Sequence, residues 1–75
     1  MRALVLIVGG EDCTLGQSNG IPAVGSCVKV VDVDDSNMDY EIVVLREPTK
    51  SDLKIAEDLT ARTEQVFTVG RRVNR

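Results

Sequence analysis

The residues with the clearest potential for chemistry are acids that lie between two apolar runs. Asp32, Asp34 and Ser36 repeat the first, third and fifth ligand positions of a calcium-binding loop of the helix-loop-helix type. Asn37 stands where the glycine of that loop belongs, and Val43 stands at the twelfth position, which should supply a bidentate carboxylate. Because that ligand is missing, and because strand-like runs flank the segment, the pattern favours a solvated hairpin turn with Asn37 at positive φ.

A second candidate is the glycine-rich segment GGEDCTLGQSNG at positions 9–20. The backbone amides of such loops bind phosphate when lysine and a hydroxyl residue follow the last glycine, and neither the spacing nor the lysine is present after Gly16. Glu11 and Asp12 would also repel a phosphate group. We therefore expect a long irregular loop that continues to Gly25, and weak binding of a cation or nucleotide is the least favoured function.

The residue types present do not favour a nucleophilic catalytic site. Cys13 lies in the glycine-rich segment, but the chain contains no histidine that could lower the pKa of its thiol. Cys27 has the character of a small core residue, and both cysteines are expected to be reduced. The sequence predicts a non-enzymatic protein, with no catalytic, cofactor-binding or metal-binding residue assigned.

The elements that would position these residues fit one small domain. A chain of 75 residues, 43% of them hydrophobic, supports a single core that is marginal in size. The apolar run 3–8 predicts a central strand that is covered on both faces. We expect a mainly β fold, either a small antiparallel sheet or an SH3-like or other small barrel, with one C-terminal amphipathic helix; the alternative is an α+β fold. The domain is expected over 1–70, followed by a basic arm over 71–75.

Alternating apolar residues between Gly25 and Leu45 predict an antiparallel hairpin. One face of this hairpin is expected to form the core, and its residues are Val28, Val30, Tyr40, Ile42 and Val44. The opposite face combines charges with the apolar residues Val31, Val33, Val43 and Leu45. This second face is too apolar to be fully solvated, so we expect that something covers part of it.

A helix in the same chain is the candidate cover. Apolar residues recur at helical spacing from about Ser51, and the stripe comprises Ile55, Ala56, Leu59, Thr63, Val66 and Phe67. Thr49 with Asp52, or Ser51 alone, supplies the side chains that cap a helix from Ser51 to about Glu64. The segment 65–73 suits either a continued helix or a final strand.

Charge is distributed unevenly along the chain. Positions 1–43 carry seven acids and two bases, whereas positions 44–75 carry seven bases and five acids. Three of those bases, Arg71, Arg72 and Arg75, lie in the expected arm. Nucleic acid is disfavoured as a partner except through this arm, because only Tyr40 and Phe67 are aromatic.

These features together favour a protein-interaction or assembly module. We expect a small subunit of a larger complex, such as a virion or another multiprotein particle, with a protein partner or a homo-oligomer and no cofactor. The expected partner-binding residues are Val31, Val33, Val43, Leu45, Arg71, Arg72 and Arg75. A small acidic regulator that binds a macromolecular machine is the alternative. The apolar run at the start is too short to cross a membrane, so we expect a cytoplasmic or particle-bound protein that is not secreted and binds no membrane.

Overall fold

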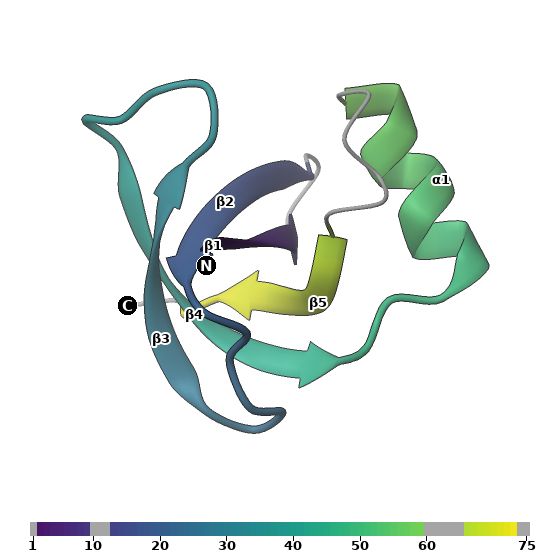
Figure 1. Cartoon of the computed structure of the whole chain (residues 1–75), viewed down its shortest axis with the longest axis horizontal. Helices are drawn as coiled ribbons and strands as arrows, with labels where there is room; N and C mark the ends of the chain where they lie inside the picture. Colours follow the sequence, from purple (N-terminus) through teal and green to yellow (C-terminus); the bar gives the residue numbers. More distant parts are fainter. Residues whose placement is uncertain (1, 10–12, 60–65, 74–75) are drawn as a thin grey trace.

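The computed structural model describes residues 2–9, 13–59 and 66–73. The elements follow one another as β1 (Arg2–Val8), β2 (Thr14–Asn19), β3 (Cys27–Asp32), β4 (Asp39–Arg46), α1 (Lys50–Leu59) and β5 (Val66–Arg72). The five strands form a closed barrel in sequence order, with α1 on its outside (Figure 1). The predicted small, mainly β fold with a helix near its C-terminal end is confirmed.

The barrel closes between its first and last strands. Consecutive strands up to β4 pair antiparallel, and β4 also pairs antiparallel with β5. β5 then pairs parallel with β1, because successive strands alternate in direction and the first and fifth therefore run the same way. β1 thus has neighbours on both sides, and its residues Ala3 to Ile7 are at most 4% exposed. The prediction of a central strand covered on both faces is confirmed.

The prediction of a long irregular loop from Gly9 to Gly25 is wrong in its middle. Residues Thr14–Asn19 form β2, which pairs with β1 from Ile7 to Arg2. Gly16 lies inside this strand, and a Cβ atom there would come 2.7 Å from Cγ2 of Val30. This glycine therefore serves close packing inside the barrel, whereas Gly9 and Gly25 lie outside the strands and have positive φ.

The barrel interior contains the core that the hairpin pattern predicted. Val30, Ile42 and Val44 are at most 1% exposed and pack with residues of β1, while Val28 and Tyr40 are partly buried against them. The register of β3 and β4 pairs Val28 with Ile42 and Val30 with Tyr40, as an antiparallel hairpin requires. The alternation of apolar residues thus correctly predicted both strands and the face that each turns toward the core.

A second apolar cluster lies on the outside of the barrel, beneath α1. Its buried members are Leu4, Leu6, Leu15, Ala56, Val66 and Val69. The helix packs mainly against β2 and β5, so of the expected outward face it helps to cover Val33 but leaves Val31 and Leu45 exposed. It contacts the barrel through Leu53 and Ala56, whereas Ile55 and Leu59 are 39% and 45% exposed.

The alternative left open for 65–73, a continued helix or a final strand, is decided in favour of the strand. Val66 and Phe67 belong to β5, where Val66 pairs with Leu4 and Thr68 pairs with Val5 across a bulge. This segment forms a strand and not a helix because the strand gives β1 its second hydrogen-bonded neighbour and buries Val66 and Val69. Thr63 and the predicted helix end at Glu64 lie outside the described residues.

The beginning of α1 has the cap that the sequence predicted, with one further partner. The Thr49 backbone N–H and hydroxyl donate hydrogen bonds to Oδ2 of Asp52, at 2.9 and 3.0 Å, and the Asp52 N–H donates to the Thr49 hydroxyl at 3.3 Å. This is a reciprocal capping box. Arg46, at the end of β4, adds an ion pair of 2.8 Å to Oδ1 of Asp52. The carboxylate therefore links the barrel to the helix.

Burial of Asp52 opposes its ionisation, but the hydrogen bonds from Thr49 and the charge of Arg46 together hold its pKa below the usual value. A lowered folded pKa gives stability that is present above about pH 4 and is lost as the pH falls through the folded value. We expect Asp52→Asn to lower the free energy of unfolding at pH 7 by about 2 kcal/mol and to flatten its decline in acid. Urea unfolding at several pH values measures both effects.

The matched control is Asp58→Asn, since Asp58 is an exposed carboxylate on the same helix. This control should change the free energy of unfolding by no more than about 0.5 kcal/mol. Equal and small losses for the two variants would show that the cap and the ion pair do not stabilise the fold.

Candidate interaction surface

The outward face of the β3–β4 hairpin retains apolar side chains in contact with solvent. Val31 is 40% exposed, Leu45 is 36% exposed and Val43 is partly exposed. Val33 differs, because it packs against the cluster beneath α1. We use the name β3–β4 outer face for the outward residues of these strands together with the first arginine of β5: Cys27, Lys29, Val31, Asp39, Glu41, Val43, Leu45 and Arg71.

The register places charges at both ends of this face. Val31 pairs with Asp39 and Lys29 pairs with Glu41, so acidic residues lie near the start of β4. Further along β4, Val43 pairs with Arg71 of β5. The acids Asp39 and Glu41 therefore lie toward the start of β4, with Lys29 opposite Glu41, while Arg71 lies beside Val43 further along the strand.

The predicted basic arm over 71–75 needs correction for its first two residues. Arg71 and Arg72 belong to β5, and they pair with Val43 and Ile42 of β4. The backbone N–H of Val73 still donates a hydrogen bond of 2.9 Å to the carbonyl of Glu41. The chain therefore stays bonded to the sheet as far as Val73, because the Glu41 carbonyl of β4 accepts this hydrogen bond. Arg75 lies outside the described residues.

Arg72 takes part in a polar cluster that sequence reasoning missed. Its guanidinium lies 4.4 Å from the centre of the Tyr40 ring, and the Tyr40 hydroxyl donates a hydrogen bond of 2.8 Å to Oδ2 of Asp32. This hydrogen bond, with burial and the negative charge of Asp32, raises the pKa of Tyr40. For Asp32, desolvation is outweighed by hydrogen bonds from the Asp34 N–H and Tyr40 and by the charge of Arg72, so its pKa is lowered.

The acidic segment between β3 and β4 is a turn held by its own side chains. Oδ1 of Asp32 accepts a hydrogen bond from the N–H of Asp34, and Oδ1 of Asp35 accepts one from the N–H of Asn37. Asn37 does not have positive φ, contrary to the prediction, because the aspartates close the turn without a left-handed residue. Among the described residues, no group of three acidic, cysteine or histidine side chains is arranged to hold a metal ion.

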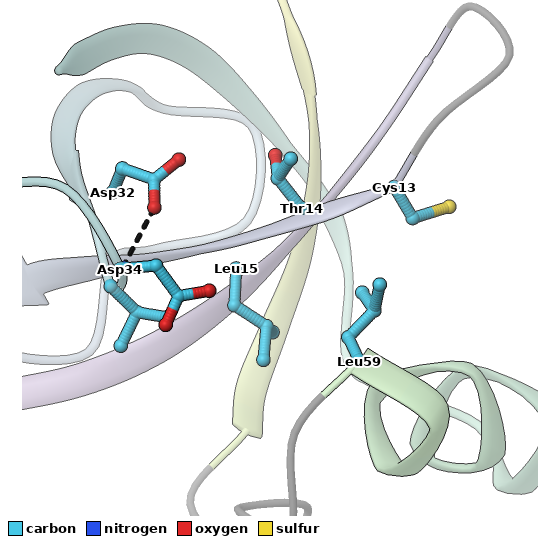
Figure 2. A pocket seen from close by; sticks show the side chains of 7 residues that line it. Cys13, Thr14, Leu15, Asp32, Asp34 and Leu59 are labelled. Carbon is cyan, nitrogen blue, oxygen red and sulfur yellow. Dashed lines mark hydrogen bonds between the residues drawn. The ribbon is translucent and has the colours of Figure 1, made fainter.

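A small pocket of about 90 Å³ lies between the start of β2, the end of β3 and the end of α1. Figure 2 shows that Cys13, Thr14 and Leu15 line it from β2 and its approach, with Leu59 on the helix side and Asp32 and Asp34 on the far side. Cys13 and Cys27 are free thiols. Cys27 is exposed, so the expectation of a core cysteine there is wrong; its side chain lies on the outward face of β3.

A larger groove of about 580 Å³ lies over the junction of β2 and β3. Polar side chains dominate its lining, with Gln17, Ser18 and Asn19 on the β2 side and Lys29 and Asp32 on the β3 side. Val31 and Val33 add the apolar part. This groove was not foreseen because it depends on where the two strands separate, which the sequence pattern does not specify.

Comparison with known proteins gives no relative for this chain. No protein-family model, no curated protein and no solved structure matches it. In the described part of the chain, no helix has the length and apolar character needed to cross a membrane.

Proposed function

We propose that this protein is a non-enzymatic assembly subunit that associates with other copies of itself through the β3–β4 outer face. The observation that carries the proposal is the exposure of Val31 and Leu45 on this face. Several apolar residues of β1, β2 and β5, including Leu6, Leu15 and Val69, are instead packed beneath α1. Apolar side chains exposed beside charges are typical of surfaces that bind a partner.

The charge pattern of the face supports a second copy as the partner. A twofold contact places the same surface on both sides, so the residues at one end of the face meet those at the other end. In that arrangement Asp39 of one copy approaches Arg71 of the other, and Val43, which pairs with Arg71, lies beside this contact. A small domain of this size also gains stability when it buries further apolar area in an oligomer.

The test combines light scattering with two substitutions on the face. We expect the parent to form a dimer or larger species, Leu45→Asp to be a monomer, and Arg71→Ser to associate more weakly with a reduced dependence on salt. Both side chains are exposed, so neither change should lower the melting temperature of the monomer by more than a few degrees.

Lys54→Ser is the matched control for the charge change, because Lys54 is an exposed base on α1. It should associate as the parent does. A monomeric parent at all concentrations would contradict self-association and would favour the small acidic regulator, whose exposed acids Asp34 and Asp35 lie on the turn between β3 and β4.

A further inference from the structure

The hydrogen-bonded ladder between β2 and β3 stops halfway along the two strands. Gly16 pairs with Asp32 and Gln17 pairs with Val31, and the register ends there. Both strands nevertheless continue, since β2 pairs with β1 as far as Asn19 and β3 pairs with β4 from Cys27. The barrel wall therefore contains a junction in which half of β3 has a neighbour on only one side.

The alternation of hydrogen bonds shows which backbone groups of β3 face this junction. The N–H of Asp32 donates to the carbonyl of Met38, and the N–H of Val44 donates to the carbonyl of Ser26, so the even-numbered residues bond to β4. The N–H of Val33 donates to the carbonyl of Leu15, so the odd-numbered residues face β2. Cys27 and Lys29 are odd-numbered, exposed and beyond the end of the β2–β3 register.

The groove over this junction combines two kinds of recognition. The amide and carbonyl groups of Cys27 and Lys29 repeat at the spacing of a strand edge, which suits an extended polypeptide. Lys29 provides a positive charge on the wall of this groove, whereas the carboxylate of Asp32 is already bonded to Tyr40 and to the N–H of Asp34. The exposed acids Asp34 and Asp35 of the adjoining turn disfavour a nucleic acid strand.

We propose that the β2–β3 groove binds an extended segment of a partner polypeptide, which adds its backbone hydrogen bonds to the open half of β3. The segment carries an acidic side chain beside Lys29. This is recognition by strand addition, in which main-chain bonds give affinity and side chains give specificity. The inference goes beyond self-association through the outer face, although Lys29 and Val31 contribute to both surfaces.

The test begins with the full chain and a phage-displayed library of random nine-residue peptides. Enriched peptides are synthesised, and amide hydrogen exchange of the parent is followed by NMR with and without peptide. We expect the Lys29 amide to exchange at least about tenfold more slowly in the complex, while the Val30 amide, already bonded to β4, changes little. No enrichment, or binding that leaves exchange at Lys29 unchanged, would overturn the proposal.

Two variants separate the backbone contribution from the side-chain charge. Lys29→Pro removes an N–H that faces the groove, a position where proline is tolerated in edge strands, and should weaken peptide binding about tenfold. Lys29→Gln keeps that N–H and should bind with a smaller loss that salt diminishes. Equal affinity of the parent and a folded Lys29→Pro variant would contradict strand addition; should that variant not fold, exchange at Lys29 in the parent decides. Light scattering tests self-association separately, so failure of one proposal leaves the other distinguishable.

Discussion

Val30→Asp is expected to unfold the protein, whereas the same change at the neighbouring Val31 should leave it folded. Val30 is 0% exposed inside the barrel, and Val31 is 40% exposed on its outward face. A carboxylate at position 30 would be buried without a cation, at a cost of several kcal/mol, which is comparable with the whole stability of a domain this small. Circular dichroism and thermal melting of the two variants provide the comparison.

The pair is well matched because the two positions are adjacent in one strand and receive the same side chain. A cooperative melt of Val30→Asp near the parent's temperature would show that position 30 is not in the core. Loss of folding in both variants would show that Val31, like Val30, packs against apolar neighbours.

The second large effect is expected from Gly16→Ala. The added Cβ would lie 2.7 Å from Cγ2 of Val30 and 3.2 Å from Cδ1 of Ile7, and both atoms belong to fully packed side chains. Such overpacking costs about 1–3 kcal/mol, so the midpoint of urea unfolding should fall clearly.

A double-mutant cycle identifies the cause of that loss. Val30→Ala alone should destabilise the protein through the cavity it leaves, by about 2 kcal/mol. In the double variant the methyl added by Gly16→Ala enters part of that cavity. The double variant should therefore lose less free energy of unfolding than the sum of the two single losses, by about 1 kcal/mol. Strict additivity would mean that the methyl at position 16 does not meet Val30.

The hairpin and the first strand could be predicted because their signals are local. Val28, Val30, Ile42 and Val44 alternate with polar or exposed residues, and a period of two residues defines an inward face without knowledge of the rest of the fold. The cap of α1 was predictable for the same reason, since Thr49 and Asp52 lie three residues apart.

The missed features depend on contacts between distant parts of the chain. β2 has the composition of a loop, and Gly16 is explained only by its position opposite Val30. Val66, Phe67 and Val69 fit both a helical stripe and a strand, and the choice is made by the neighbouring β1. The cluster of Asp32, Tyr40 and Arg72 joins three strands, so only the barrel register brings these side chains together.

The parallel pairing of β1 with β5 has a consequence for how the chain acquires its structure. β1 is synthesised well before the strand that completes its environment, Val66–Arg72. Contacts so distant in sequence require closure of a long loop, which slows folding compared with local pairing. Until β5 leaves the ribosome, the apolar side chains of β1 have no permanent cover on one side. The growing chain therefore passes through a stage in which it is prone to aggregate or to need a chaperone.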